Sequence, residues 1–363
     1  MSLPMRFSAI DGKGPSVLAR WRRRVLATLV QALSLAALFH VPAGAQAPAL
    51  REVRLSVPGP GGSVSLPLEL AVRLGLDRAE GLQLRLKFVG GGGIAFQDIQ
   101  SGNAEYAVYG MPAAMSHHLK DPRIVSLAAL DDLPLYVLMV RQDLRGKVRR
   151  IADLKGRTIG MHSSSLTAQT TSDILLELVL AGQGVAAGDI RRASVGQSWE
   201  TESAAFLSGS VDAMMNDEPF ATRMVGEKMA FQLYSTGKPD DARKTPGAGF
   251  LRAALIGRRD RIEVDPVTAD RMVRVVQRVL AWMAGHTPEQ IADALGMQAG
   301  AERESFLTVA RKYPRQYSRD GKFSTAQLRE TEVFFRASTP GDAAAQKLAL
   351  DTMIIDRWAG RKP

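Results

Sequence analysis

Residues 153–167 read DLKGRTIGMHSSSLT, and this stretch decides the fold of the chain. It begins with a turn at 153–156, continues as a short apolar run at 158–161, and ends in four hydroxyl side chains, those of Ser163, Ser164, Ser165 and Thr167. The segment that follows has apolar side chains at helical spacing, namely Ile174, Leu175, Leu178 and Val179. The order of turn, buried strand, polar loop and helix is typical of an open α/β sheet.

The hydroxyl cluster predicts a ligand contact. In an open α/β sheet, ligands bind at the loops that leave the C-terminal ends of the strands. The start of the next helix also offers unpaired backbone N–H groups and a positive dipole end, both of which suit an anion. One hydroxyl is enough to cap that helix, whereas this loop holds four. We therefore expect at least one of the four hydroxyls to contact a ligand.

Composition excludes several classes of protein. With 363 residues, of which 45% are hydrophobic and 23% charged, the chain can bury the cores of two globular domains. It has no cysteine, which excludes thiol nucleophiles, thiolate metal sites and disulfides. Half of its net charge of +10 comes from residues 1–45, which contain six Arg and Lys and one Asp. The remaining basic residues are dispersed, so we expect no nucleic-acid partner.

The first segment predicts export. Residues 21–24 are WRRR, residues 25–39 form an almost unbroken apolar run, and VPAGA at 41–45 supplies small residues for cleavage. This is the pattern of a secretory signal peptide, and its apolar run is short for a membrane anchor. We predict a cleaved signal peptide at 1–45 and a periplasmic protein. The Sec route is favoured, although WRRRVL also loosely fits a twin-arginine signal.

The mature chain alternates strands and helices, which predicts mostly parallel sheets with right-handed crossovers. The expected strands are 51–57, 82–89, 106–109, 124–130, 135–140, 158–161, 190–195, 211–215, 231–234 and 250–256. The expected helices include 66–80, 94–101, 113–119, 201–208, 220–225 and 267–284, followed by a helical segment to residue 363. Residues 99–107 and 206–213 share one local pattern, helix end, Ser-Gly turn, acid and strand, which indicates two similar lobes.

Four blocks carry a resemblance to a known family. They are LAVRLGLDRAEGL at 70–82, SGNAEYA at 101–107, DLKGRTIG at 153–160 and GSVDAMMNDEP at 209–219. In order and spacing they resemble the periplasmic substrate-binding proteins of ABC importers, in the sulfonate/nitrate/taurine and thiamine-precursor group (NMT1/THI5-like, SsuA-like). The resemblance spans about residues 51–290.

The resemblance implies an α/β protein with the two-lobed periplasmic binding protein fold (type II), in which a hinge and a ligand cleft lie between the lobes. Lobe 1 is then expected at 51–140 plus 246–290 and lobe 2 at 141–245, with C-terminal helices at 291–363 packing on both. Lobe closure around a solute is the expected working motion. The implied partners are a small-molecule solute and an ABC permease in the inner membrane, and we expect a monomer.

The ends of the strands supply the candidate ligand-binding residues. Besides the hydroxyl cluster, these are Gly62, Ser63, Gly110, Met111, Trp199, Asp217 and Glu218. The loop at 58–63 is PGPGGS, so Ser63 is its one obvious polar contact. Trp199 is expected either to stack on a ligand or to lie half-buried at the surface. Asp217 and Glu218 are expected either to bind a cationic group or to cap the helix that begins at Pro219.

Other site types are disfavoured. The run GGGG at 90–93 lacks the spacing of a dinucleotide fingerprint, so no cofactor is expected. Adjacent residues on a helix do not chelate together, so His117 and His118 do not predict a metal site. His162 precedes the serines, but the sequence has no G-x-S-x-G elbow and no Asp placed to orient the imidazole.

The sequence therefore predicts a binding protein and not an enzyme. We expect an extracytoplasmic component of an ABC transporter that captures a sulfonate or nitrate-like anion, a pyrimidine or an aromatic carboxylate. The alternatives are an enzyme acting on a small carboxylate or pyrimidine on the same scaffold, and a solute sensor that signals to a membrane partner.

Overall fold

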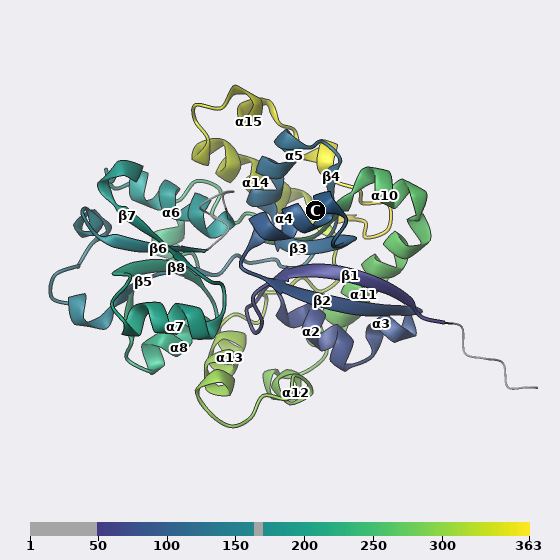
Figure 1. The fold of residues 1–363 in the computed structure, drawn as a ribbon, viewed down its shortest axis with the longest axis horizontal. Helices are drawn as coiled ribbons and strands as arrows, with labels where there is room; N and C mark the ends of the chain where they lie inside the picture. The colour runs from purple at the N-terminus through teal and green to yellow at the C-terminus, as the bar shows by residue number, and fades with distance from the viewer. Residues whose placement is uncertain (1–48, 163–169) are drawn as a thin grey trace, which may run out of the picture. The chain divides into compact units, whose positions relative to one another are not determined.

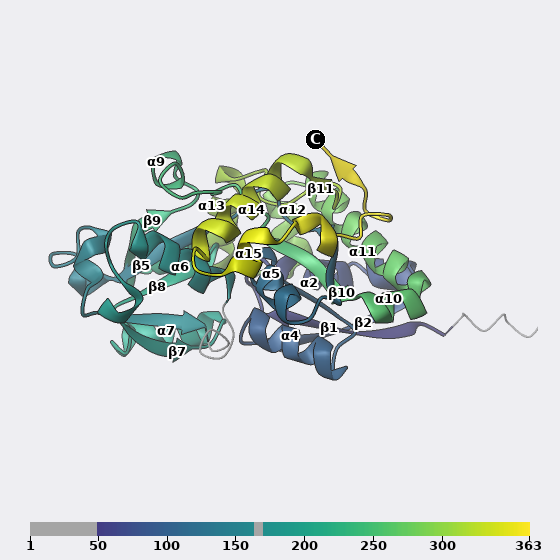
Figure 2. The same ribbon diagram turned by 90° about the horizontal axis from the view of Figure 1, so that it is seen from above.

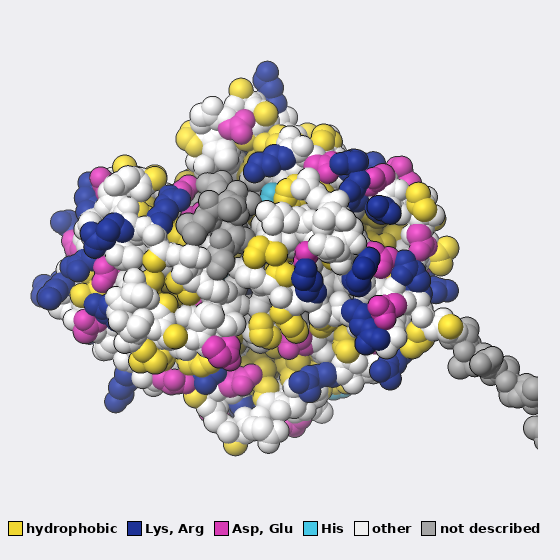
Figure 3. All heavy atoms as spheres, in the orientation of Figure 1, with side chains coloured by type: hydrophobic (Ala, Val, Ile, Leu, Met, Phe, Trp, Pro, Cys, Tyr) yellow, Lys and Arg dark blue, Asp and Glu magenta, His cyan; other side chains and the backbone are white. Residues whose placement is uncertain are grey.

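The structure is a computed structural model that describes residues 49–162 and 170–363 (Figure 1). The predicted signal peptide at 1–45 and the hydroxyl cluster, Ser163, Ser164, Ser165 and Thr167, lie outside the described residues. In the described part of the chain, no helix combines the length and the apolar character needed to cross a bilayer. Acidic and basic side chains are interspersed over the face shown in Figure 3.

Two sheets form the framework, and each is built mainly from strands that run in one direction. The first has the order β2-β1-β3-β10-β4. Its strands are β1 (Arg51–Pro58), β2 (Leu82–Val89), β3 (Tyr106–Gly110), β4 (Ile124–Ala129) and β10 (Ala253–Arg258). β1 pairs in parallel with β2 and β3, whereas β10 is antiparallel to both β3 and β4.

The second sheet repeats this plan with the order β7-β6-β8-β5-β9. Its strands are β5 (Tyr136–Arg141), β6 (Thr158–His162), β7 (Arg191–Val195), β8 (Ala213–Asp217) and β9 (Ala230–Ser235). β6 is parallel to β7 and β8, whereas β5 is antiparallel to β8 and β9. Residues 136–140, which the sequence prediction grouped with the first lobe, therefore belong to the second sheet.

The reversed strand of each sheet has one physical origin. The chain leaves the first sheet at the C-terminal end of β4 and enters the second as β5, and it returns from β9 as β10. A strand that enters at the edge where the other strands end must run against them. The prediction of mostly parallel sheets thus holds for the other strands of each sheet, and the crossings bring the strand ends of both sheets to one region.

Helices cover both sheets, as the periodic apolar positions predict. The helices between the strands of the first sheet and after β10 are α2 (Leu66–Arg73), α3 (Leu76–Ala79), α4 (Gly92–Ser101), α5 (Met111–Lys120), α10 (Arg259–Val264) and α11 (Pro266–Ala284). Those of the second sheet are α6 (Thr171–Ala181), α7 (Trp199–Leu207), α8 (Phe220–Gly226) and α9 (Pro239–Ala242). The predicted helix at 66–80 is split into α2 and α3 because Gly75 adopts φ 67°.

Helix α11 illustrates how the pattern produces the packing. Pro266 occupies its first turn, and the Asp265 carboxylate accepts a hydrogen bond from the Thr268 N–H at 3.0 Å. Its apolar stripe is fully buried against the first sheet, as the predicted helix at 267–284 requires; the stripe consists of Met272, Val275, Val276, Val279 and Leu280.

The C-terminal segment contacts both sheets' helices. It contains α12 (Pro288–Ala294), α13 (Ala301–Lys312), α14 (Thr325–Ser338) and α15 (Ala343–Lys347), with short paired strands β11 (Phe323–Ser324) and β12 (Arg361–Lys362). α13 packs against α8 (Figure 1), and α14 packs against both α5 and α6 (Figure 2). The segment therefore ties elements of the two sheets together at more than one place.

Gly110 marks a close approach between elements of the two sheets, which gives a first testable prediction. A Cβ atom at Gly110 would lie 1.9 Å from Thr171 Oγ1 and 2.6 Å from Thr171 Cβ. We expect Gly110→Ala to lower the free energy of unfolding in urea by about 1–3 kcal/mol, because this contact cannot relax cheaply.

Two variants check that explanation. Thr171→Gly in the Gly110→Ala background removes both clashing atoms and is expected to restore part of the loss. Gly146→Ala places its Cβ in open space and is expected to change stability by less than about 0.5 kcal/mol. Equal effects at Gly110 and Gly146 would contradict the close approach.

Candidate functional site

The ends of strands from both sheets converge on a group of residues that we call the strand-end cluster: Gly110, Met111, Thr171, Asp217 and Arg252. Met111 N–H donates to the Arg252 carbonyl at 2.7 Å, and Gly110 lies against Thr171. The Arg252 guanidinium Nη2 lies 2.8 Å from Asp217 Oδ2. The cluster therefore joins β3, α6, β8 and the segment that enters β10.

Arg252 is the centre of this cluster. Its side chain is only 1% exposed and lies between two carboxylates, with Nη1 3.8 Å from Asp131 Oδ2 on its other side. The guanidinium carbon lies 5.0 Å from the centre of the Tyr136 ring. Asp131 is also held by the backbone, since it accepts from the Arg252 N–H at 3.0 Å. Two carboxylates and an aromatic face compensate for the cost of burying this charge.

Buried donors and acceptors around Arg252 are left without hydrogen-bond partners in the described chain. Among the described residues, Arg252 Nε has no acceptor, and Asp217 Oδ1 and Asp131 Oδ2 have no donor. The Nη2 contact with Asp217 is close but has the geometry of an ion pair and not of a directed hydrogen bond. Because buried polar atoms are rarely left unpaired, this group can accept a ligand that supplies the missing partners.

Burial and charge set the protonation of the cluster. Burial raises the pKa of Asp131 to about 7, although the nearby Arg252 charge opposes that rise. Burial alone would lower the pKa of Arg252, but Asp217, Tyr136 and Asp131 raise it further above its ordinary value. The carboxylates therefore favour the charged form of Arg252, whereas burial favours the neutral form of Asp131.

The family follows from the comparison of the chain with known proteins. A family model described as "NMT1/THI5 like" matches residues 64–291, which is more than half of the chain. This chain belongs to the NMT1/THI5-like family. No curated protein matches it significantly in sequence.

Solved structures show the fold of this NMT1/THI5-like chain. A protein from Bordetella bronchiseptica RB50 matches with a TM-score of 0.76 and 21% identity, over 85% of this chain and 95% of that one. The alkanesulfonate-binding protein SsuA from Xanthomonas axonopodis pv. citri, bound to MOPS, matches with a TM-score of 0.63 and 16% identity over 85% and 99%. A Candida albicans protein described as having the generic periplasmic binding protein fold matches with a TM-score of 0.66 and 14% identity over 85% and 97%. The chain therefore has the periplasmic binding protein fold that the sequence predicts.

Asp217 and Glu218 have different roles in the structure. Asp217, the last residue of β8, faces Arg252. Glu218 Oε2 accepts the Thr222 N–H at 2.9 Å, so Glu218 caps the first turn of α8, and burial raises its pKa. Capping, one of the two roles considered for this pair, thus applies to Glu218. Whether either carboxylate contacts a ligand stays a prediction.

Trp199 lies away from the cluster, whereas a neighbour that the sequence did not single out reaches it. The Arg223 guanidinium lies 3.7 Å from the centre of the Trp199 ring, and the edge of Phe220 lies against it at 6.1 Å between ring centres. Gln197 instead donates from Nε2 to Asp217 Oδ2 at 3.4 Å. Its backbone carbonyl also lies directly against Gly59 in the loop after β1.

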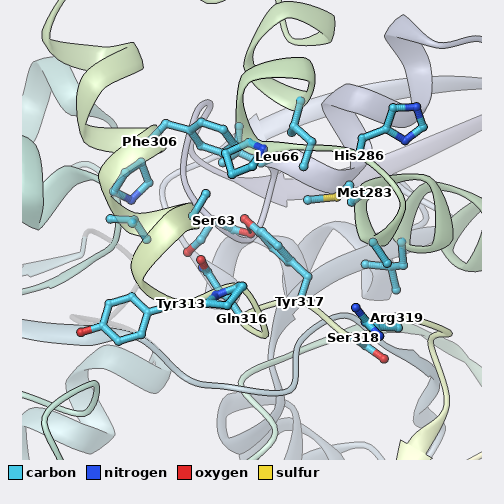
Figure 4. Close-up of a pocket in the computed structure, with 18 residues that line it drawn as sticks. Ser63, Leu66, Met283, His286, Phe306, Tyr313, Gln316, Tyr317, Ser318 and Arg319 are labelled. Atoms are coloured by element: carbon cyan, nitrogen blue, oxygen red, sulfur yellow. Dashed lines mark hydrogen bonds between the residues drawn. The ribbon is translucent and has the colours of Figure 1, made fainter.

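Gly62 and Ser63 lie in the loop after β1, and Ser63 lines a cavity (Figure 4). The Gly62 carbonyl accepts hydrogen bonds from Ser65 and Leu66, which fixes the loop at the start of α2. Ser63 is buried, and its carbonyl accepts the Tyr317 hydroxyl at 3.0 Å. In the described ranges, Ser63 Oγ has no hydrogen-bond partner.

A buried polar chain lies beneath the end of β6. His162 Nδ1 is 2.9 Å from Ser172 Oγ, and His162 Nε2 is 3.3 Å from Glu202 Oε1. Asn216 Nδ2 donates to the other Glu202 oxygen at 2.6 Å. Burial lowers the pKa of His162, but the hydrogen bond and charge of Glu202, together with the charges of Asp217 and Asp173, raise it, and the net shift is upward.

The buried polar network around His162 contains a contact that the sequence analysis did not find. The sequence shows no Asp placed to orient His162; in the structure Glu202, 40 residues away along the chain, lies against the imidazole. Such a long-range pair leaves no local motif. His117 and His118 have structural contacts: His117 stacks on Phe96 at 4.1 Å between ring centres, and His118 Nδ1 lies 2.7 Å from the Ile124 carbonyl.

Asp173, at the start of α6, gives a pH-dependent prediction. Burial raises its pKa to about 7 from an ordinary value of 3.8, with a further contribution from Glu177. Between these two values the folded protein holds a proton that the unfolded chain has released, so stability falls as the pH rises through this window. Asp173→Asn has no titrating carboxyl at this position, so it removes this fall in stability with rising pH.

The expected result is a gain in stability that grows with pH. The difference in unfolding free energy between Asp173→Asn and the wild type is expected to increase by on the order of 2 kcal/mol from pH 5 to pH 8 in urea titrations. The exposed control Asp240→Asn is expected to show no such trend. A difference for Asp173→Asn that is the same at both pH values would contradict the raised pKa.

Proposed function

We propose that this NMT1/THI5-like protein is the extracytoplasmic solute-binding component of an ABC importer. In this proposal it captures a small organic solute between its two sheets and delivers that solute to a permease in the inner membrane. The observation that carries the proposal is the buried Arg252, whose Nε lacks an acceptor in the described chain at the point where strand ends from both sheets meet. Binding at such a junction links solute capture to the arrangement of the two lobes.

The chemistry of the cluster favours a solute with an anionic head group. A sulfonate or carboxylate oxygen is a suitable acceptor for Arg252 Nε, and charge-assisted hydrogen bonds of this kind are strong. The predicted hydroxyls of Ser163, Ser164, Ser165 and Thr167 follow β6 directly in the chain and are proposed to bind the same group. The solved SsuA structure similar to this chain is an alkanesulfonate-binding protein bound to MOPS, which supports a sulfonate as the first class to test.

Lobe closure is the proposed motion. The proposed lobes are residues 51–140 plus 246–290 for lobe 1 and residues 141–245 for lobe 2. We assign β5 (Tyr136–Arg141) to lobe 2, because it pairs with strands of the second sheet. Contacts between the two lobes include Gly59 with Gln197, Gly110 with Thr171, and Arg252 with Asp217. A solute held by both sides stabilises this arrangement relative to an open one, because only the closed form makes all the contacts. Export by the signal peptide at 1–45, a periplasmic location and a monomeric state are parts of the same proposal.

One observation favours an enzyme as the second candidate. Ser172, His162 and Glu202 form a hydroxyl–imidazole–carboxylate chain of the type used in nucleophilic catalysis. However, the Ser172 hydroxyl is buried in the first turn of α6 and also bonds Thr170 Oγ1 at 3.0 Å. Such a hydroxyl is committed to the structure, so we favour binding without chemical change.

A thermal-shift screen of the purified protein tests the proposal. The panel contains sulfonates, nitrate, pyrimidines and aromatic carboxylates. One class is expected to raise the unfolding temperature by a few degrees, since a ligand at 100 times its dissociation constant contributes about 2.7 kcal/mol. Chromatography after incubation is expected to return the compound unchanged. Consumption of a compound would instead support the enzyme.

Two variants separate this site from others. Arg252→Lys keeps the charge but loses the planar fork, and is expected to weaken binding at least tenfold by calorimetry. The matched control Arg258→Lys lies at the other end of β10, where Arg258 pairs with Asp260, and is expected to leave affinity unchanged. Unchanged affinity in both variants would contradict a role for Arg252 in solute binding.

A further inference from the structure

A cavity separate from the strand-end cluster lies beneath the C-terminal helices. It has a volume of about 200 Å³ and is enclosed by the end of α11, by α12 and α13, and by the loop at 313–319 (Figure 4). Ser63 and Leu66 close it from the start of α2. Its described lining includes none of the five strand-end cluster residues, although Tyr317, which lines it, is near enough to Arg252 and Asp217 to interact with their charges.

The walls of this cavity are apolar and rigidly placed. Leu280 and Met283 come from α11, Ile291 from α12, and Phe306 and Val309 from α13. All five side chains are buried, and α12 packs against α13. Helix packing therefore shapes a hollow that favours the apolar body of a ligand and not a hydrated ion.

One end of the cavity carries polar groups, and one of these groups lacks a hydrogen-bond partner among the described residues. The Tyr317 side chain points toward Ser63 and donates its hydroxyl to the Ser63 carbonyl (Figure 4). Ser63 Oγ, by contrast, has no hydrogen-bond partner among the described residues, although Ser63 is only 2% exposed. A buried hydroxyl without a partner is uncommon and requires an explanation. A polar atom on a ligand in the cavity supplies one.

We propose that this cavity is a second binding site, which takes a single-ring aromatic molecule carrying one hydroxyl group. The ring fits among the walls from α11, α12 and α13, because an apolar cavity of about 150 Å³ already accommodates benzene. The hydroxyl bonds Ser63 Oγ at the polar end. Arg319, the charged side chain of the lining, is exposed to solvent, whereas the walls from α11, α12 and α13 are buried and apolar, so the neutral hydroxyl is favoured over a carboxylate inside the cavity.

The test uses p-cresol and toluene as probes, which share the ring and the methyl group and differ in the hydroxyl. Calorimetry of the purified protein is expected to show that p-cresol binds more tightly than toluene. Ser63→Ala is expected to weaken the binding of p-cresol about five- to tenfold, the effect of one neutral hydrogen bond, and to leave the binding of toluene unchanged. Equal losses for both probes, or none for either, would overturn the role of Ser63.

Filling the cavity tests its location. Ala310 on α13 lines the cavity and is only partly buried, so Ala310→Phe projects a ring into the space and is expected to weaken both probes at least tenfold. The matched control Ala337→Phe fills a different hollow, between α6 and α14, and is expected to leave both affinities unchanged. Circular dichroism confirms that each variant is folded.

The failure of this inference is distinguishable from failure of the proposed transport function. Arg252→Lys is expected to leave p-cresol binding intact while it weakens the binding of the solute at the strand-end cluster. If wild-type protein does not bind p-cresol, or if Ala310→Phe binds it as well as the wild type, the second site is wrong whatever the solute screen shows. If p-cresol binding is lost in Arg252→Lys but kept in Ala310→Phe, the probe occupies the strand-end cluster and the second site is again wrong.

Discussion

The ion pair between Arg252 and Asp217 is the interaction on which the rest of the structure depends. Arg252 belongs to the segment that enters the first sheet, and Asp217 is the last residue of β8 in the second. Both are buried, so neither charge is stable without the other, and loss of one partner of a buried pair typically costs about 3–5 kcal/mol. The crossing strands β5 and β10 begin beside this pair, so the pair lies where the strand ends of both sheets meet.

The same constraint connects structure to recognition. A buried guanidinium that is electrically balanced but not fully hydrogen-bonded holds its remaining donor in a fixed direction, in surroundings from which most water is excluded. A solute oxygen therefore gains a strong hydrogen bond without a large change in net charge. Tyr136 and Asp131 hold the guanidinium from the other sides, so its orientation does not depend on the solute. Glu218, one residue after Asp217, is used for capping and leaves the pair undisturbed.

Much of the fold could be predicted from the sequence because it rests on local patterns. The apolar stripe of α11 with its Asp265 cap, and the alternation in β1 and β2, are local features, and the structure contains each of them. The exchange of β5 to the second sheet could not be predicted, because pairing depends on partners more than 70 residues away. Arg252 and Glu202 were missed for the same reason. A charged residue within the apolar run FLRAALI was a visible sign for Arg252, since such a charge must find buried partners. The ligand contacts proposed at the strand ends stay predictions.

Amide hydrogen exchange with the tightest-binding compound of the solute screen tests the central claim most directly. If the solute binds at the junction of the two sheets, saturation slows exchange at residues 110–113, 171–173, 216–218 and 250–253, which come from both sheets and adjoin Arg252. Slower exchange confined to one sheet, or confined to α11, α12 and α13, would contradict the account, because the solute would then be held without the buried pair that joins the lobes.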